Sequence, residues 1–391
     1  MKKIIALVKG DGSAPEMMEQ ATKIAIKAAE KNNIGIEFVE TPMGWNAYEK
    51  YGDTLPEESL RKATELNILF FGGIGDPEID KTIGKNHPEM LPESRCLLRI
   101  RKEWGLLLNF RPMIFYPQLK HLAKIRPDLI PDDRIIRQIF VRFLLEDSYF
   151  GNIDLRDFIP ETTRTNLNIK LKKDITGEET IVSDIAYYRK DTIEKYLRAA
   201  FRYARQTNLP LISIDKANVI ARYVLWRKTC ERMGKDVFPD VELRHIYVDA
   251  GNMLLFNPAR LNGVIVCGNE HGDILSDGAA EAVGSLGMMC SSAINPDTNQ
   301  AMFESGAGTA PTLAGQDKAN PIGRILTAAM MLRHIGAEKG ASAIENSVFK
   351  ILSEGCRTAD IASSKGSGLN MYEYVVTTSH MGDLILENLD L

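Results

Sequence analysis

Strand-like apolar runs that end in glycine turns and lead into helical patterns recur along the chain, and this alternation restricts the fold most strongly. Residues 4–8 form the first apolar run, residues 10–12 a glycine turn, and a helical pattern that opens with Pro15 continues to about Lys31. Residues 34–40 indicate a second strand, and residues 67–77 a buried strand that ends in glycines. Since strands alternating with helices build helix-covered parallel sheets, we predict an α/β protein with its active face at the carboxyl ends of strands.

The same alternation continues in the second half of the chain. Apolar periodicity predicts helices over residues 190–207 and 221–233, and short apolar runs indicate strands over residues 210–220 and 263–267. A further helix is predicted where the sequence reads IGRILTAAMMLRHIG. No internal repeat or low-complexity segment interrupts the pattern.

Size and composition limit the classes of protein to consider. A chain of 391 residues with 44% hydrophobic content can bury a large core and is expected to form two domains. The net charge of -4 gives no general basic field for nucleic acid. The first apolar run is too short for a signal peptide, and no segment reaches the ~20 apolar residues of a membrane helix. Five scattered cysteines without CxxC spacing predict neither a disulfide framework nor a zinc site, so we expect a reducing, cytoplasmic setting.

Three acids stand out in residues 247–277. Asp249 ends a strand-like run, and Asp273 and Asp277 lie four residues apart at a predicted helix start. That spacing places the last two carboxylates on one helix face, one turn apart. Oxygen ligands without cysteine or clustered histidine suit Mg²⁺ or Mn²⁺. The alternative is a solvated helix N-terminus, where aspartate is favoured by the helix dipole.

Basic residues at the ends of predicted elements indicate an anionic substrate. Arg101, Arg111 and Arg142 are well separated in sequence, and the planar guanidinium binds carboxylates through two hydrogen bonds, so together they suit a dicarboxylate. The alternative is three exposed arginines among many. Lys216 ends the strand-like run at 210–216, where its pKa could be adjusted for proton transfer, or it is an ordinary exposed lysine.

Two further segments have distinctive composition. Residues 152–186 are polar with weak strand alternation, which indicates either an arm that contacts a partner or a solvated loop. Residues 303–311 form a predicted loop of mostly small residues that could approach a phosphate or ribose closely.

Taken in order, these motifs resemble the metal-dependent β-decarboxylating dehydrogenases, the family of isocitrate, 3-isopropylmalate, homoisocitrate, tartrate and D-malate dehydrogenases. The resemblance covers nearly the whole chain and is closest in pattern to the 3-isopropylmalate and D-malate or tartrate enzymes. The segments that carry it are NFRP with Arg111, YFG with Tyr149, SIDKANV with Lys216, YVDA with Asp249, GDILSD with Asp273 and Asp277, and AGQDKANP before the last long helix.

The resemblance implies a two-domain isopropylmalate/isocitrate dehydrogenase-like fold. The large domain would be discontinuous, with residues 1–106 and 284–391, and the small domain would comprise residues 107–283 with a protruding dimer arm at 152–186. It also implies a homodimer with shared active sites that could assemble further. Lys216 and Asp249 would come from one subunit, and the other metal-binding acids from its partner.

The resemblance also implies the reaction and the role of each matching residue. The expected reaction is NAD- and metal-dependent oxidative decarboxylation of a (2R)-2-hydroxy diacid. Arg101, Arg111 and Arg142 would clamp the carboxylates. Asp249, Asp273 and Asp277 would hold Mg²⁺ or Mn²⁺. Lys216 would move the hydroxyl proton, and Tyr149 would help to protonate the enol carbon.

The chain departs from the family pattern mainly in the predicted cofactor loop. Ala307 replaces a histidine that packs near adenine, and Thr312 replaces the acid that holds the ribose of NAD. The lysine and tyrosine of NADP enzymes are also missing, and we favour NAD because the sequence shows no cation for a 2'-phosphate near this loop. The candidate cofactor-binding residues are Glu304, Gly308, Thr309, Ala310, Thr312 and Asn320. Smaller departures are Ser13, Ala14, Phe143, Glu270 and His271.

Substrate choice depends on the residues before the first arginine. Leu97 and Leu98 favour a substrate with an apolar or absent β-substituent, such as isopropylmalate or D-malate, whereas Arg95 and Arg99 leave room for a longer acid of the isocitrate or homoisocitrate type. Two other hypotheses remain open: a catalytically silent regulatory subunit, and a family enzyme with an altered cofactor or substrate. Nucleic acid and membrane partners have no supporting feature.

Overall fold

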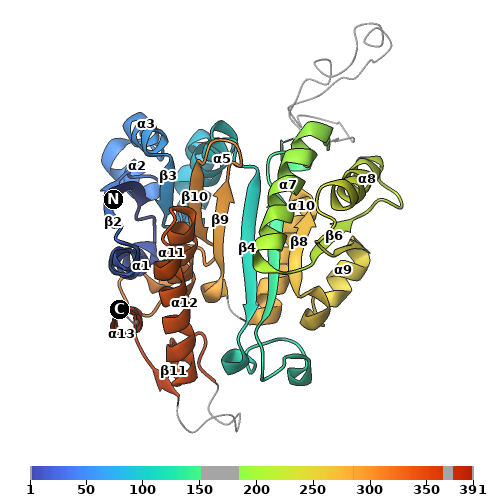
Figure 1. The fold of residues 1–391 in the computed structure, drawn as a ribbon. Coiled ribbons are helices and arrows are strands. Elements are labelled where there is room, and N and C mark those ends of the chain that lie inside the picture. Colours follow the sequence, from blue (N-terminus) through green and yellow to red (C-terminus); the bar gives the residue numbers. More distant parts are fainter. Residues whose placement is uncertain (1, 151–184, 285, 364–372, 390–391) are drawn as a thin grey trace, which may run out of the picture.

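The computed structural model describes residues 2–150, 185–284, 286–363 and 373–389. The predicted arm at 152–186 lies outside these residues except for its last two positions. The described chain is a mixed α/β protein, as predicted from the alternation of elements (Figure 1).

One ten-stranded sheet forms the centre of the molecule, with the strand order β2-β1-β3-β10-β9-β4-β5-β8-β6-β7 (Figure 1). The strands at both ends of this order pair in parallel, whereas the central run β10-β9-β4-β5 is antiparallel. The strands are β1 (Lys2–Val8), β2 (Gly35–Glu40), β3 (Ile68–Phe71), β4 (Leu108–Phe115), β5 (Ile136–Phe143), β6 (Leu211–Asp215), β7 (Leu243–Tyr247), β8 (Gly263–Cys267), β9 (Cys290–Ile294) and β10 (Ala301–Ser305).

Helices cover both faces of this sheet. Among the described residues, the α-helices longer than four residues are α1 (Ala14–Ala29), α2 (Trp45–Tyr51), α3 (Glu57–Leu66), α5 (Arg99–Glu103), α7 (Lys190–Thr207), α8 (Ala221–Asp236), α9 (Val248–Leu254), α10 (Asn269–Val283), α11 (Ile322–His334), α12 (Glu338–Ser353) and α13 (Thr378–Glu387). A short second ladder joins β11 (Cys356–Arg357) to β12 (Tyr374–Val375).

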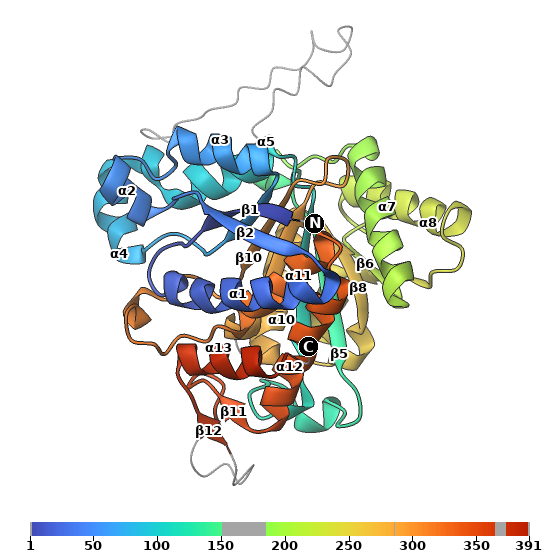
Figure 2. The same ribbon diagram turned by 60° about the vertical axis from the view of Figure 1, so that its left-hand side comes forward.

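Alternating side chains of β1 supply two separate cores. Ile5 and Leu7 pack with the apolar residues of α1, α11, α12 and α13, and Figure 2 shows these four helices grouped over one face. Ala6 and Val8 pack on the other face with α3 and α5. Because successive residues of a strand point to opposite faces, an all-apolar strand indicates a sheet buried on both sides.

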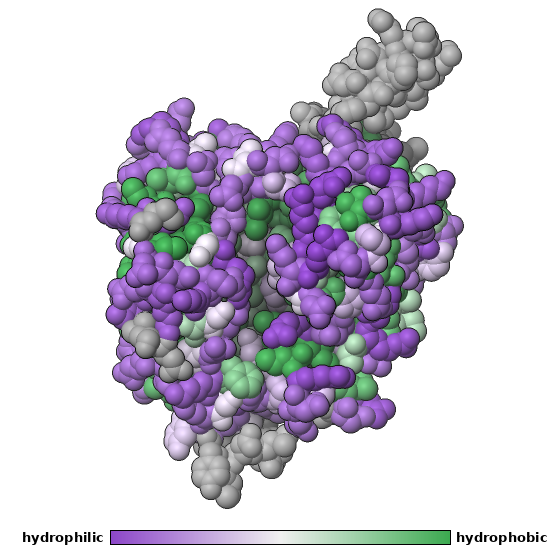
Figure 3. Space-filling view, in the orientation of Figure 1, coloured by the Kyte–Doolittle hydropathy of each residue, from purple (hydrophilic) through white to green (hydrophobic). Residues whose placement is uncertain are grey.

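The other half of the sheet is covered in the same way. Helices α7 and α8 pack Tyr196 and Trp226 against Val141 and Val266, and α10 packs against Phe140 from the opposite face. On the face that carries α7, α11 and α12, the molecular surface is hollowed along its middle, between α7 and the other two helices (Figure 3). The two halves therefore carry separate helix layers on this face.

The predicted strands over 67–77 and 210–220 are shorter in the structure, as β3 (Ile68–Phe71) and β6 (Leu211–Asp215), and three further predictions differ. Asp249 does not end a strand, because β7 stops at Tyr247 and Asp249 lies in the first turn of α9. Arg111 lies in the middle of β4 and not at an element end. The predicted loop at 303–311 begins later, since β10 continues to Ser305. Short apolar runs do not distinguish strands from helical turns, which explains the first error.

The sheet order places the strands of residues 1–106 and 284–391 in one half and those of 107–283 in the other. The division into two domains itself stays a prediction. Within the described residues, no helix is long and apolar enough to cross a membrane.

Candidate active site

Helix α10 brings its acids to the sheet through Asn269, the first residue of the helix. The buried Asn269 amide donates hydrogen bonds to the carbonyl oxygens of Leu144 (2.7 Å) and Glu146 (3.0 Å), just after β5. Its oxygen accepts a 2.7 Å bond from Arg142 Nε. The first turn of α10 is therefore fixed to the end of β5, and Asp273 follows one turn later.

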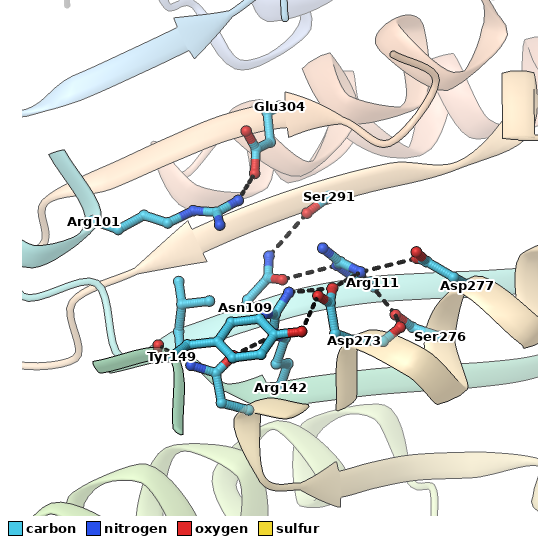
Figure 4. A network of polar contacts seen from close by, with 12 residues as sticks. Arg101, Asn109, Arg111, Arg142, Tyr149, Asp273, Ser276, Asp277, Ser291 and Glu304 are labelled. Carbon is cyan, nitrogen blue, oxygen red and sulfur yellow. Dashed lines mark hydrogen bonds and ion pairs between the residues drawn. The ribbon is translucent and has the colours of Figure 1, made fainter. Parts of the chain in front are cut away.

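Asp273 is the centre of a polar cluster (Figure 4). Its carboxylate accepts hydrogen bonds from Arg111 Nη1 (3.0 Å), from Arg142 Nη1 and from the Tyr149 hydroxyl (3.1 Å). Arg142 is only 2% exposed, and Arg111 is half-buried. The alternative of freely exposed arginines is therefore wrong for this pair. Burial, and secondarily the charge of Arg111, lowers the pKa of Arg142 to about 10, while Asp273 opposes this shift.

Asp277 lies one turn beyond Asp273 on the same helix face, as the spacing predicted. Arg111 Nη1 donates to both carboxylates, at 3.0 Å to Asp273 and 3.1 Å to Asp277, and to the Ser276 hydroxyl at 2.9 Å (Figure 4). Desolvation raises the pKa of Asp277, and the Arg111 charge partly offsets this. One cation thus already lies between two acids, which is the arrangement that a shared divalent ion needs.

Tyr149 follows β5 and lies against the same cluster. The Arg142 guanidinium stands 5.2 Å from the centre of its ring. Desolvation raises the pKa of the Tyr149 phenol, and the charge of Asp273 and the hydrogen bond to it add to the effect. The phenol is therefore protonated at neutral pH and can donate its proton.

Arg101 lies apart from Asp273 and faces β10 (Figure 4). Its Nη2 donates to Glu304 at 2.5 Å, and both side chains are largely buried. Glu304, which we predicted to bind the cofactor, is thus the partner of a predicted substrate-binding arginine. The alternative that Arg101 is an exposed surface arginine is also wrong, because only 7% of this residue is exposed.

Lys216 and Asp249 form a second group. Lys216 follows β6 directly, and its ammonium is paired with the exposed Asp249 carboxylate. The Lys216 hydrogen bond lowers the pKa of Asp249. Among the described residues, no hydrogen bond or ion pair joins this group to Asp273 or Asp277.

Leu97 and Leu98 lie on the helical turn before α5 and are partly buried. Neither arginine of this turn is free. Arg95 makes two hydrogen bonds to Asp53 (2.7 and 2.6 Å), and Arg99 pairs with Glu103 at 2.7 Å.

The predicted cofactor loop packs against the first glycine turn. The Thr309 carbonyl accepts hydrogen bonds from the Ser13 backbone (2.8 Å) and hydroxyl (2.9 Å). A Cβ on Gly12 would come within 2.5 Å of the same carbonyl oxygen, so only glycine permits this contact. The Gly308 carbonyl accepts a 2.8 Å bond from Arg324. Ser13, a departure from the family pattern, thus holds the loop in place.

The remaining cofactor candidates lie around the start of α11. Asn320 is buried, its oxygen accepts from the backbone of Ile322 (3.0 Å), and its amide donates to Asp360 (3.0 Å). Ala310 adopts a left-handed conformation with φ 37°, and Thr312 is exposed on the loop.

Two other departures form part of an aromatic cluster beside α10. His271 stacks on Tyr223 with ring centres 4.9 Å apart, and Phe143 packs against Tyr188, Tyr196 and Trp226. Burial lowers the pKa of His271. Packing among aromatic rings therefore accounts for Phe143 and for the stacked ring of His271.

Sequence reasoning missed Asn109, Asn269 and Ser276, which orient the cluster. Asn109 accepts from Arg111 Nε at 2.9 Å and donates to the Ser291 hydroxyl at 2.9 Å. Asn109 lies in NFRP and Ser276 in GDILSD, so both stood inside quoted motifs. For Asn269, the one signal in the sequence is its position two residues after the apolar run that ends at Cys267.

Within one chain, the carboxylate oxygens of this cluster supply only some of the ligands that a hard divalent ion needs. Asp273 and Asp277 offer carboxylate oxygens on one helix face, but the described residues contain no group of three or more His, Cys, Asp or Glu that could hold a metal ion. Further ligands would have to come from water, substrate or a second chain.

The helix-covered α/β sheet thus carries arginines and acids gathered around the first turns of one helix, α10. Comparison with known proteins gives the family. The model of the isocitrate/isopropylmalate dehydrogenases matches residues 4–385. The 3-isopropylmalate dehydrogenase of Desulfotalea psychrophila is 36% identical over 387 residues, 99% of each chain, and that of Oleidesulfovibrio alaskensis is 37% identical over 390 residues, the full length of both.

A solved structure agrees with this result. The isocitrate dehydrogenase from Methylococcus capsulatus superposes with a TM-score of 0.76 at 27% identity, over the whole of both chains. The present chain belongs to the isocitrate/isopropylmalate dehydrogenase family. It is an oxidoreductase of the decarboxylating dehydrogenase class, which confirms the resemblance seen in the sequence motifs.

Proposed function

We propose that the protein catalyses the NAD- and divalent-metal-dependent oxidative decarboxylation of a (2R)-2-hydroxy diacid of the 3-isopropylmalate or D-malate type. The observation that carries this proposal is the convergence of Arg111, Arg142 and Tyr149 on Asp273. Two guanidinium groups and a phenol beside two acids can bind a carboxylate, orient a neighbouring hydroxyl and supply a proton.

The charges near Leu97 and Leu98 support the choice of substrate. A third carboxylate, as in isocitrate, would be favoured by a free cation or by polar hydrogen-bond donors on this turn. Arg95 and Arg99 are instead neutralised by Asp53 and Glu103. The two leucines are then the groups left to contact the β-substituent, which favours an isopropyl group or a hydrogen atom.

The metal would be held by Asp273 and Asp277, with Asp249 of a second copy as a third acid. A bound Mg²⁺ or Mn²⁺ stabilises negative charge that develops on the substrate oxygen during oxidation and decarboxylation. Arg111 and Arg142 would hold the carboxylates of the diacid. The chain's own acids and arginines thereby fix the substrate relative to the cation.

Proton transfers would be carried out by Lys216 and Tyr149. Lys216, as the neutral amine, would accept the hydroxyl proton during hydride transfer and become an ammonium that Asp249 can pair with. Tyr149 gives its proton to the enol carbon after CO₂ leaves. The raised pKa of Tyr149 keeps that proton in place until the enol forms.

A homodimer would bring these groups together, since Lys216 and Asp249 make no contact with Asp273 within one chain. Large apolar side chains are exposed beside both groups, including Met253 on α9 (71% exposed) and Ile274 on α10 (62% exposed). A second copy that covered these residues would bury apolar surface and place its own Lys216 at the site. A cytoplasmic location is supported by the five free cysteines.

The nucleotide would lie at the loop that follows β10. Two observations fit a phosphate-bearing cofactor at this loop. Gly12 packs closely on Thr309, and the buried Arg324 has no partner for its Nε and Nη1 among the described residues. The loop has no acid for the ribose, because Thr312 stands at that position. A catalytically silent regulatory subunit is therefore the second candidate, favoured by Ala307 and Thr312.

The test measures nicotinamide reduction by the purified dimer with Mn²⁺, either nucleotide, and a panel of 3-isopropylmalate, D-malate, tartrate, isocitrate and homoisocitrate. We expect turnover with NAD and either 3-isopropylmalate or D-malate. The matched control is Lys216→Ala, which keeps the carboxylate clamp. No turnover by a folded protein that binds Mn²⁺ and 3-isopropylmalate would contradict the proposal and favour the regulatory subunit.

A further inference from the structure

Arg324 is a buried cation whose hydrogen-bonding capacity is mostly unused. It lies in the first turn of α11 and is only 1% exposed. Its Nη2 donates to the Gly308 carbonyl at 2.8 Å, but its Nε and Nη1 have no partner among the described residues. A guanidinium has five N–H donors, and buried donors are normally satisfied. The structure therefore leaves this residue without most of its expected partners.

The charges around Arg324 are also unbalanced. Glu304 is the nearby acid that acts on it, and the same carboxylate is already bonded to Arg101 at 2.5 Å. Arg101 Nε likewise has no partner within the described chain. Two buried guanidinium groups thus share one carboxylate, which leaves a net positive charge in a buried place. Such a charge is costly unless an anion accompanies it.

The surroundings of Arg324 are two glycine turns that an anion can approach closely. A Cβ on Gly73 would stand 2.9 Å from Arg324 Nη2 and 3.6 Å from Nη1, so the backbone of Gly73 lies directly against the guanidinium. Gly73 and Gly308 both have positive φ, at 84° and 64°. The space beside Gly75 and Gly308 is open, since a Cβ on either would meet nothing within 4 Å.

We propose that Arg324 is a phosphate-binding residue of the nucleotide site, which donates hydrogen bonds to phosphate oxygens between the turn at 72–75 and the loop at 306–310. The inference rests on the proposed function, because it assumes that a dinucleotide binds at these two glycine turns. The inference also accounts for nucleotide binding without the usual side chains at Ala307 and Thr312. Phosphate binding by Arg324 would compensate for the adenine and ribose contacts that these two residues do not make. The phosphate ester can be the pyrophosphate common to NAD and NADP or the 2'-phosphate of NADP.

The position of Arg324 favours the pyrophosphate. Its hydrogen bond goes to Gly308, whereas Thr312, at the position that matches the family's ribose-binding acid, lies further along the loop. A guanidinium binds two oxygens of one phosphate through parallel N–H bonds, which Lys cannot reproduce.

The experiment measures nucleotide binding by isothermal titration calorimetry, without substrate or turnover. The probes are adenosine, ADP and 2'-AMP, and the variants are Arg324→Met, Arg324→Lys and, as a control, Ser13→Ala. The control loosens the same loop by removing the hydroxyl bond to Thr309 but leaves the charge unchanged. Thermal unfolding of each ligand-free variant tests its folding.

We expect Arg324→Met to weaken ADP binding about tenfold or more while adenosine binding stays the same, because one charge-assisted interaction is lost. Arg324→Lys should recover part of the loss, and the melting temperature of Arg324→Met should not fall. Loss of 2'-AMP binding alone would assign the phosphate to the 2' position. Ser13→Ala should weaken adenosine and ADP equally.

Unchanged ADP binding in Arg324→Met would overturn the inference and leave the proposed function intact. An equal loss for adenosine and ADP would also overturn it, since Arg324 would then only hold the loop, as Ser13 does. If Arg324→Met does not fold, the ratio of ADP to adenosine affinity in Arg324→Lys decides the same question. A wild-type protein that binds none of the probes would overturn both the inference and the proposed nucleotide dependence.

Discussion

Asp273 and Asp277 have the same proposed role as metal ligands, but their surroundings differ. Replacing each by asparagine therefore separates the contribution of the carboxylate to stability from its contribution to metal binding. Asp273 balances the buried Arg142 and also accepts from Arg111 and Tyr149. Asp277 has one hydrogen bond from Arg111, and its side chain is 65% exposed. Asn keeps the shape of Asp and removes its charge, so both variants test electrostatics alone.

The expected loss of stability differs by several fold between the two variants. Asp273→Asn leaves Arg142 as a buried cation without an acid, which costs about 3 kcal/mol. Asp277→Asn removes an exposed pair, which is worth at most ~1 kcal/mol. With an unfolding entropy of about 2.1 cal/mol/K per residue, ~3 kcal/mol lowers the melting temperature of a chain of this size by ~4 °C, against ~1 °C for Asp277→Asn.

The assay is thermal unfolding of the metal-free protein in chelator, followed by titration with Mn²⁺. Both variants should need at least ~10 times more Mn²⁺ for half-saturation, because each removes one charged ligand. Equal melting temperatures for the two variants would refute the structural role of Asp273. Unchanged Mn²⁺ binding in either variant would refute the assignment of that residue as a ligand.

Three further predictions can be tested independently. Lys216→Ala should lower kcat by ~10²–10⁴-fold, the usual range for a lost proton-transfer group, with little change in melting temperature; a strongly unfolded variant would mean that Lys216 is structural. Leu98→Asn should lower kcat/KM for 3-isopropylmalate by ~10-fold but leave D-malate nearly unchanged, and an equal loss for both acids would contradict an apolar subsite. Burial raises the pKa of Glu146 to about 7, above the ordinary 4.5, so the folded state favours its protonated form and stability falls as pH rises from 4.5 to 7. Glu146→Gln should remove this loss and be more stable than wild type at pH 8 but not at pH 4, as measured by urea unfolding, and parallel pH profiles for the two proteins would refute it.

The sequence predicted the elements whose periodicity is long and regular. Helix α7 begins and ends at the predicted residues, Lys190 and Thr207, because its apolar stripe extends over five turns. Strand β8 is likewise confirmed, since a buried five-residue apolar run between glycine and polar residues has few alternatives. Asp249 was misplaced because its segment is too short to show a period.

The residue types of the candidate site were predictable, but their pairing was not. The spacing of Asp273 and Asp277 fixes their common face through helix geometry alone. Which arginine meets Asp273 depends on the register of β4 and β5, which sets Asn109 opposite Arg142 and Arg111 opposite Phe140. That register arises from tertiary packing of both faces, and no local pattern in the sequence determines it.

Arg324 shows that contacts at the proposed nucleotide loop could not be predicted from the sequence either. The sequence shows no cation within residues 304–312, and for this reason we favoured NAD over NADP. Folding brings the first turn of α11 under Gly308, so a residue that is 16 positions away in sequence donates to the loop carbonyl. A cation that lies behind a glycine turn leaves no signature in the turn itself. Cofactor preference in this family therefore has to be judged from buried charges beneath the loop as well as from the loop sequence, and the comparison of ADP with 2'-AMP measures that contribution directly.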